Sequence, residues 1–268
     1  RATAVGVFTA SAPLGFALGQ FGGPRIAAVA GWPAVLPTFA GLAVVGMVIF
    51  LVTTHGYEFS VSAEVPDRAA LVSLFTDRGV WTLCLLCFIA FDLYLVLNSW
   101  LPSYLSEGLG VGLALSGLLT AVFPAVGVVA RTGGGVLSDR LFDGHRRPVA
   151  VLAIAVATPG VLGLVVTRHV GTVVGLVVVA GLGVQLAIGL LFSYVTEVVA
   201  SEVRTTAVSL LTAAGLAGAG LAPVVAGGLI ERVGYQTTFL VAGLVGAVGV
   251  AVAWRAPEPA DAVDAART

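Results

Sequence analysis

Eight apolar runs of membrane length dominate this sequence of 268 residues. A hydrocarbon core about 30 Å thick is crossed by roughly 20 helical residues at about 1.5 Å each. In lipid, backbone N–H and C=O groups must bond within the protein, so such runs form helices, and the alternating polarity of barrel strands is not seen here. The sequence therefore predicts an all-α integral membrane protein. The predicted spans are residues 4–29, 34–54, 79–105, 112–137, 149–167, 171–198, 205–230 and 236–255.

The composition agrees with a chain that faces lipid. Hydrophobic residues make up 58% and charged residues only 10%, with a mean hydropathy of +1.05. A soluble domain carries about 25% charged residues. The net charge is −1 and all 13 basic residues are Arg, which excludes a polybasic nucleic-acid surface. The lipid bilayer is thus an expected partner and nucleic acid is not. The Arg-only basic residues, with abundant Ala, Val and Gly, favour a prokaryotic plasma membrane.

The distribution of Arg predicts the orientation. With eight spans, both termini and three loops fall on one side, which holds nine Arg, while the opposite side holds three. Basic residues concentrate in cytoplasmic loops, so both termini are predicted to be cytoplasmic in a multi-pass protein of the cell membrane.

A polar stretch at residues 55–78 is the best domain boundary and is predicted to be a cytoplasmic linker. It separates the last two helices of one bundle, residues 1–54, from a six-helix bundle at residues 79–255. Residues 256–268, rich in Pro, Ala and Asp, are predicted to form a disordered cytoplasmic tail.

The sequence repeats itself without gaps over the first and seventh predicted helices. RATAVGVFTASAPLGFALGQ, from Arg1, aligns with RTTAVSLLTAAGLAGAGLAP, from Arg204, and the same register aligns Gly31 with Gly234. A repeat six helices long is the plan of carriers built from parallel repeats. The chain is therefore predicted to hold helices 5–12 of a twelve-helix fold, with the first four absent. A genuine eight-helix protein is the alternative.

One loop motif resembles the major facilitator superfamily (MFS). GGGVLSDRLFDGHRRP, residues 133–148, is similar to that family's cytoplasmic loop pattern of Gly, three residues, Asp-Arg and a basic pair, with extra residues before the pair. YVTEVVASEVRTTAVSL, residues 194–210, resembles the family's Glu before an Arg-Gly-Thr-Ala helix start, and the Gly-rich first helix resembles its fifth. The resemblance implies an MFS fold, alternating access and a cytoplasmic gate. The gate residues it implies are Gly135, Asp139, Arg140, Arg146, Arg147, Glu197 and Arg204. As a simpler alternative, these charges only set the topology.

Other protein classes fit the sequence less well. An intramembrane enzyme would need a nucleophile with a base, or clustered carboxylates, at membrane depth, whereas all three His lie in predicted loops. A channel is disfavoured by the repeat and the loop motif. Cys84 and Cys87 lie in an apolar span without a second pair and are predicted to pack in the core. We therefore expect no enzyme activity, no metal site and no cofactor.

Two ionisable residues fall at membrane depth, where charges are costly and usually functional. Asp92 lies near the middle of the third span, and Arg131 lies about 12 Å inward of Asp139. The stretch VVARTGGGVLSDR, residues 128–140, resembles the eighth helix of nitrate/nitrite and monocarboxylate porters. A guanidinium offers a planar fork of donors for nitrate or carboxylate oxygens.

The expected function is that of a secondary transporter for a small anion such as nitrate, nitrite or a carboxylate. Arg131 is predicted to bind the substrate, Asp92 to hold Arg131 in the empty site, and Asn98 and Gln185 to add polar contacts. A coupling proton is compatible with this plan. The alternative is a proton-coupled drug or metabolite exporter of the same superfamily that uses Asp92 for coupling. A structural pair of Asp92 with Arg131 is the non-functional alternative.

Overall fold

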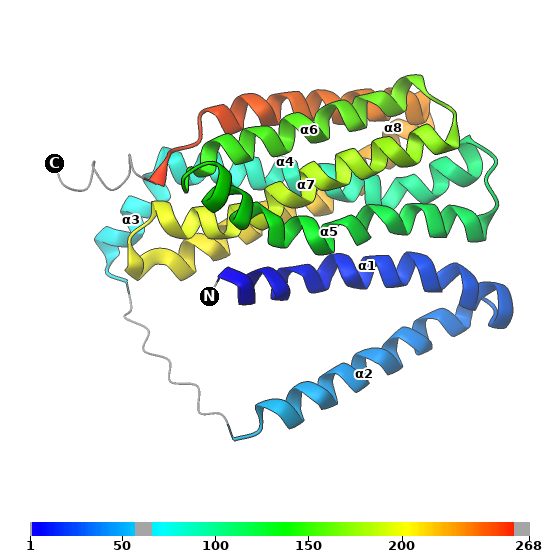
Figure 1. The fold of residues 1–268 in the computed structure, drawn as a ribbon, viewed down its shortest axis with the longest axis horizontal. Helices are drawn as coiled ribbons and strands as arrows, with labels where there is room; N and C mark the ends of the chain where they lie inside the picture. The colour runs from blue at the N-terminus through cyan, green and yellow to red at the C-terminus, as the bar shows by residue number, and fades with distance from the viewer. Residues whose placement is uncertain (1, 57–65, 260–268) are drawn as a thin grey trace.

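The computed structural model shows a bundle of long helices (Figure 1). It describes residues 2–56 and 66–259, and for residues 2–9, 132 and 134–136 it describes the backbone only. Over these residues the structure contains no strand. The helices are α1 (Ala2–Ala30), α2 (Val35–Thr54), α3 (Arg68–Thr76), α4 (Arg78–Ser103), α5 (Leu113–Leu141), α6 (Arg146–Val166), α7 (Val170–Val198) and α8 (Arg204–Trp254), with short helical turns η1 (Trp32–Ala34), η2 (Tyr104–Gly108) and η3 (Ser201–Val203).

The long helices match the predicted spans. Among the described residues, six segments are long and apolar enough to cross a membrane, and residues 201–254 form one of these six. Helix α1, which is not among the six, has 29 residues. The single non-helical residue inside α8 is Gly234, at φ 80° and ψ 173°, which divides it into 204–233 and 235–254. The eight predicted spans therefore correspond to α1, α2, α4 to α7 and the two parts of α8. The all-α membrane fold is confirmed.

The two glycines that the repeat aligned have the same backbone conformation. Gly31, after α1, has φ 79° and ψ 159°, close to the values at Gly234. A positive φ costs little only for a residue without Cβ, and it stops a helix. Helices α1 and 204–233 therefore end in the same way.

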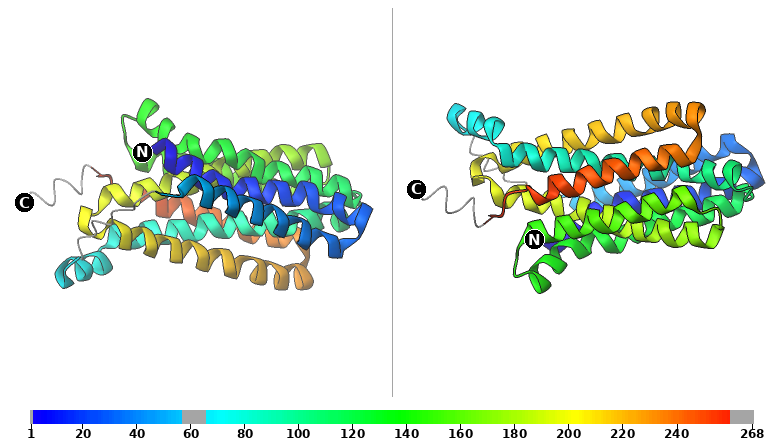
Figure 2. Two further views of the ribbon diagram at one scale, coloured as in Figure 1. Left: turned by 90° about the horizontal axis from the view of Figure 1, so that it is seen from below. Right: turned by 90° about the horizontal axis from the view of Figure 1, so that it is seen from above.

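Helices α4 to α8 pack into one bundle (Figure 2). Helix α4 packs on α8, α6 lies against both α7 and α8, and α5 lies against α7. Close approach depends on small residues, as is usual between helices in lipid. A Cβ at Gly218 of α8, for example, would collide with the backbone carbonyl of Phe88 in α4.

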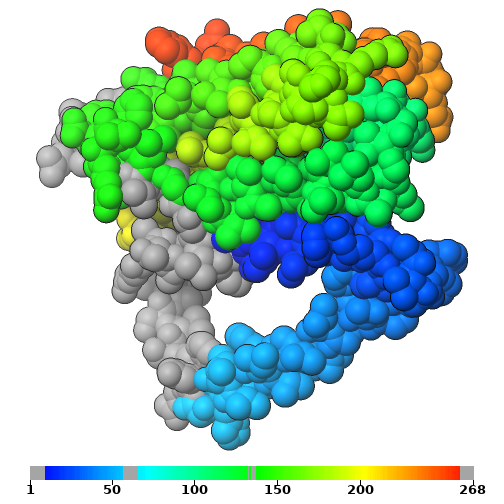
Figure 3. Space-filling model, turned by 45° about the vertical axis from the view of Figure 1, so that its right-hand side comes forward, coloured from blue at the N-terminus to red at the C-terminus, as the bar shows by residue number. Residues whose placement is uncertain are grey.

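Helix α1 packs along α5, but α2 diverges from the bundle (Figures 1 and 3). None of the residues of α2 is buried, and apolar side chains such as Leu36 and Val52 are more than 70% exposed. A soluble protein rarely exposes such a surface, whereas in a membrane it faces lipid or other helices.

The predicted linker and tail contain ordered structure. Residues 55–78 include α3, which begins where the Asp67 carboxylate accepts the N–H of Ala70 at 2.7 Å. Residues 57–65 of the linker and 260–268 of the tail lie outside the described part. At the start of the predicted tail, Ala256 and Glu258 are 1% and 5% exposed.

Candidate functional site

Arg131 of α5 is buried at membrane depth, with 7% of its surface exposed. Its Nε–H donates to Oε1 of Gln185 in α7 at 2.7 Å. Its guanidinium carbon lies 5.4 Å from the ring centroid of Tyr94 in α4, a cation–π geometry. We call these three residues the Arg131 site. Helices α4, α5 and α7 each contribute one of them.

Two glycines allow α5 and α7 to approach closely enough for this contact. A Cβ at Gly189 of α7 would collide with the backbone carbonyl of Arg131. A Cβ at Gly127 of α5 would overlap the amide of Gln185. Any larger residue at either position would have to move a helix or one of the two polar side chains.

Tyr94 of the Arg131 site packs against two further aromatic rings. Tyr94 stacks on Phe123 of α5 with ring centroids 5.6 Å apart, and meets Phe16 of α1 edge-to-face at 5.8 Å. Burial of polar atoms among such rings is costly without hydrogen bonds. Over the described residues, the Tyr94 hydroxyl and Nε2 of Gln185 are nevertheless buried with no hydrogen-bond partner. The site therefore has spare hydrogen-bonding capacity in an apolar setting.

A second polar contact lies one helical turn from Tyr94. Nε2 of Gln20 in α1 donates to Oδ1 of Asn98 in α4 at 2.8 Å and to the Asn98 carbonyl at 3.0 Å. Nearby, Gly117 of α5 lies so close to α1 that a Cβ there would come within 2.7 Å of the Gln20 carbonyl and 2.6 Å of Pro24 Cγ. Asn98, predicted as a substrate contact, is thus bonded across to α1.

The structure does not bring Asp92 to Arg131. Residues two apart on a helix point about 200° apart, so Asp92 and Tyr94 lie on opposite faces of α4. Asp92 shares its face with Leu85 and Ser99, both exposed, whereas Tyr94 is buried under Arg131. Among the residues that the structure describes, no ion pair joins Asp92 to Arg131. Counting residues along the helix predicted how deep Asp92 lies in the membrane, but not which face of α4 it occupies.

A second buried guanidinium, that of Arg146, lies where α5, α6 and α7 end near the loop motif. It makes two hydrogen bonds with the Glu197 carboxylate, each 2.8 Å long, and an ion pair with Asp139 at 2.9 Å. We call Asp139, Arg146 and Glu197 the Arg146 cluster. These residues come from three helices, so the cluster ties the ends of α5, α6 and α7 together. Asp139, one of the gate residues that the resemblance implies, pairs with Arg146, another of them.

The remaining predicted gate residues lie around this cluster. Arg140 and Arg204 are exposed, and within residues 66–259 no ion pair involves either of them. Gly135 lies in the last part of α5. Arg147 reaches Glu258 at 3.7 Å.

Glu258 was missed by the sequence analysis. Its carboxylate accepts the backbone N–H of Arg146 at 3.2 Å, at the first residue of α6, where a negative charge is favourable. The hydroxyl of Tyr194 donates to the Pro257 carbonyl at 2.6 Å and holds the same segment against α7. A stretch rich in Pro and Ala carries no pattern that would reveal such docking.

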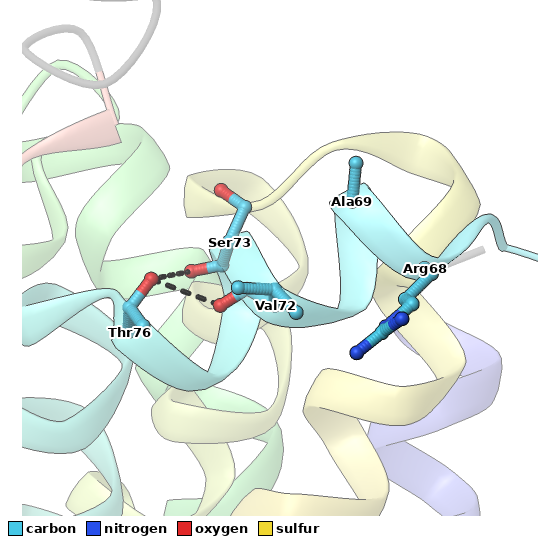
Figure 4. A pocket seen from close by; sticks show the side chains of 5 residues that line it. All are labelled: Arg68, Ala69, Val72, Ser73 and Thr76. Atoms are coloured by element: carbon cyan, nitrogen blue, oxygen red, sulfur yellow. Dashed lines mark hydrogen bonds between the residues drawn. The ribbon is translucent and has the colours of Figure 1, made fainter.

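The cysteines and a cavity beside α3 do not add a second site. Cys84 and Cys87 are buried free thiols in α4. A cavity of about 560 Å³ is lined by Arg68, Ala69, Val72, Ser73 and Thr76, all on the exposed side of α3 (Figure 4). The Thr76 hydroxyl there bonds the backbone of its own helix at Val72 and Ser73. A shallow cavity formed by one short helix, with this hydroxyl satisfied, offers little to recognise a ligand.

Repeated bundles of membrane-length helices, with a buried cation at depth and a charge cluster at the helix ends, define a carrier-type membrane protein. The chain belongs to the Major Facilitator Superfamily, whose family model matches residues 1–202 and 134–267. It is a multi-pass membrane protein with that fold.

Three curated bacterial relatives are similar over part of their length. The chain is 29% identical over 128 residues to the nitrite extrusion protein of Bacillus subtilis, a match that covers 48% of this chain and 32% of the relative. It is 34% identical over 158 residues to the probable sulfoacetate transporter SauU of Cupriavidus necator, covering 56% and 36%. It is 25% identical over 185 residues to the probable nitrate transporter NarT of Staphylococcus haemolyticus, covering 68% and 47%. These matches span about a third to a half of the relatives.

Solved structures share the fold. A bacterial homologue of the human lysosomal transporter Spinster, in an inward-facing and occupied conformation, has a TM-score of 0.69 and 17% identity, covering 96% of this chain and 70% of that one. The inward-facing and unoccupied form has a TM-score of 0.62 and 16% identity, covering 89% and 58%.

Proposed function

We propose that this chain is part of a secondary active transporter that carries a small anion by alternating access, with Arg131 as the main substrate ligand. The observation that carries the proposal is a guanidinium buried at membrane depth and held by a neutral amide and an aromatic ring. These two neutral contacts fix its position and do not cancel its charge. The printed names of the relatives, which concern nitrite, nitrate and sulfoacetate, support the same substrate class.

The physical reason is electrostatic. A cation in a medium of low dielectric attracts an anion far more strongly than in water, and its planar fork of donors matches the oxygens of nitrate, carboxylate or sulfonate. Phe123, which is fully buried and stacks on Tyr94, adds to the apolar surroundings of the site. A small oxyanion would replace the hydration that the buried guanidinium has lost.

Alternating access would use the two ends of the helices differently. Both Spinster homologue structures are described as inward-facing, and that conformation is the one we propose here. The Gln20–Asn98 bond and the tight contact of Gly117 with α1 would then close the outer half. The Arg146 cluster would act as the latch at the cytoplasmic ends of α5, α6 and α7. Residues 1–54 would belong to one bundle and 79–255 to the other, with 55–78 between them.

Uptake assays on the carrier that contains this chain test the assignment of Arg131. Arg131→Ala should abolish nitrate or sulfoacetate uptake, and Arg131→Lys should lower it by about tenfold or more, because an ammonium lacks the planar fork. The matched control is Arg232→Lys, on the exposed face of α8. Normal anion uptake in both Arg131 variants, at equal membrane expression, would refute the proposal.

The orientation of the helices is tested separately by labelling single cysteines from outside intact cells. Leu141, the last residue of α5, is 71% exposed, and Arg168 is exposed between α6 and α7. If both termini are cytoplasmic, Arg168→Cys is labelled by an impermeant reagent and Leu141→Cys is not. The opposite result would invert the topology.

A further inference from the structure

The amide of Gln185 has an orientation that chemistry fixes. The Nε–H of Arg131 can only donate, so the atom of Gln185 that faces it at 2.7 Å must be the carbonyl oxygen Oε1. The NH₂ group then points away from Arg131. It is fully buried and, within the described part of the chain, forms no hydrogen bond of good geometry, although the Tyr94 hydroxyl lies beside it.

Packing holds the amide in place, and its bond to Arg131 fixes which of its two ends faces the guanidinium. The open side of Gly127 lies directly against the amide, with no room for even a methyl group between α5 and the side chain. A turned amide would present its NH₂ to another donor and would lose the bond to Arg131. An unsatisfied buried donor has a substantial energetic cost, so its retention here calls for a partner that arrives from elsewhere.

The groups around the Gln185 NH₂ can all donate hydrogen bonds. The Arg131 guanidinium is a donor only, the Gln185 NH₂ is a donor, and the Tyr94 hydroxyl, also buried without a partner over the described residues, can donate. A ligand end that carries only acceptors satisfies all three. An ammonium or a neutral amide would place a donor against a donor.

We infer that Gln185 is a specificity-determining residue. With its NH₂ group, the Arg131 site is a cluster of donors, and it selects oxyanions whose bound end carries acceptors only. This inference rests on the proposed anion transport. The matching ligands are nitrate, nitrite, carboxylates and sulfonates in their ionised forms. Bonds to charged groups are strong, and loss of the amide donor should weaken anion binding by about tenfold or more.

Two substitutions test this role in the purified carrier. Gln185→Met keeps the length and removes both the donor and the acceptor for Arg131. Gln185→Glu keeps an acceptor for Arg131 but adds a negative charge where the anion would bind. The readout is the rise in unfolding temperature on adding nitrate, nitrite or sulfoacetate, with the unfolding temperature in chloride-free buffer as the baseline. The control is Gln236→Glu, on α8 away from the Arg131 site.

The inference predicts about tenfold or more weaker anion binding in Gln185→Met and no anion-induced rise in Gln185→Glu. The baseline should fall in Gln185→Met, which also loses the acceptor for Arg131, but not in Gln185→Glu, which keeps one. An anion-induced rise of normal size in both variants would overturn it. A lowered baseline in both would assign Gln185 a structural role and would also overturn it. If Arg131→Ala still abolishes uptake in either case, the proposed function stands; if Arg131→Ala transports normally, the proposed function itself fails.

Discussion

Two arginines in this molecule are almost equally buried but lie in different surroundings. Arg131 is 7% exposed and Arg146 is 9% exposed. Arg146 forms a double hydrogen bond with one carboxylate and an ion pair with another. The contacts of Arg131 include a neutral amide and the face of a tyrosine ring.

The difference separates a structural cation from a ligand-binding one. Carboxylates cancel the charge of Arg146 while joining three helices, so its contribution is to the stability of the helix ends. The amide and the ring position Arg131 but leave its charge in place, which suits a group that must bind and release an anion. Burial alone does not distinguish the two; the chemistry of the partners does.

The largest expected effect separates the two arginines by stability. Arg146→Ala removes charged hydrogen bonds and should lower the free energy of unfolding by about 1.5–3 kcal/mol, with the lower end favoured because Asp139 is 57% exposed. Arg131→Ala removes one buried hydrogen bond to a neutral group and should lower it by less, about 1 kcal/mol, while abolishing uptake. Thermal and denaturant unfolding in detergent measures both. The control, Arg140→Ala, should be neutral. A larger loss of stability in Arg131→Ala than in Arg146→Ala would break the comparison.

The next effect tests how the Arg131 site is positioned. Gly189→Ala would force its Cβ against the backbone of Arg131 and should cost about 1–3 kcal/mol, with weaker anion binding. Gly175→Ala, on the same helix with nothing within 4 Å of the added Cβ, is the matched control. It should be neutral or stabilising by up to about 1 kcal/mol, since Ala is the better helix former. Equal effects of the two substitutions on unfolding would show that the α5–α7 contact does not limit the site.

A smaller effect concerns the tail segment beside the Arg146 cluster. Glu258→Gln keeps the shape of the side chain but removes its charge from the first turn of α6 and from Arg147. The expected loss is about 0.5–1 kcal/mol, reduced at high salt, because Arg147 is 44% exposed. The free energy of unfolding at low and high salt measures it, with Glu231→Gln at an exposed position as control. A loss that does not depend on salt would mean that the carboxylate acts by packing and not by charge.

The sequence predicts much of the fold because membrane spans are read from length and apolarity alone. The eight spans and the repeat, including Gly31 and Gly234, needed no tertiary contact to be recognised. Arg131 and Gln185 were predicted as site residues because polar residues at membrane depth are conspicuous in an apolar sequence. Their hydrogen bond depends on Gly127 and Gly189, whose role appears only once α5 and α7 are packed.

Other parts of the site could not be predicted in this way. Phe16, Phe123 and Tyr94 look like ordinary core residues in an apolar span, because nothing in the spacing shows which aromatic faces a cation. Asp92 lies at the expected depth but on the opposite face of α4 from Tyr94, since the rotation of a helix is set by its neighbours. Glu258 was hidden by a composition that is typical of disorder.

The smallest expected effect concerns the contact that joins α1 to the Arg131 side of α4. The Gln20–Asn98 bond crosses between two helices, as the bonds of the Arg146 cluster do, but both partners are neutral. Hydrogen bonds between membrane helices contribute about 0.6 kcal/mol on average, so a double-mutant cycle of Gln20→Ala and Asn98→Ala should give a coupling energy of that order. Unfolding in detergent measures the four proteins of the cycle, and Gln20→Ala with Ser99→Ala serves as the uncoupled control because Ser99 lies on the exposed face of α4. If Asn98 instead binds substrate on its own, the coupling energy would be near zero while Asn98→Ala alone weakens anion binding. In that case the polar contacts of the site would extend a full turn beyond Tyr94, and α1 would have no part in positioning them.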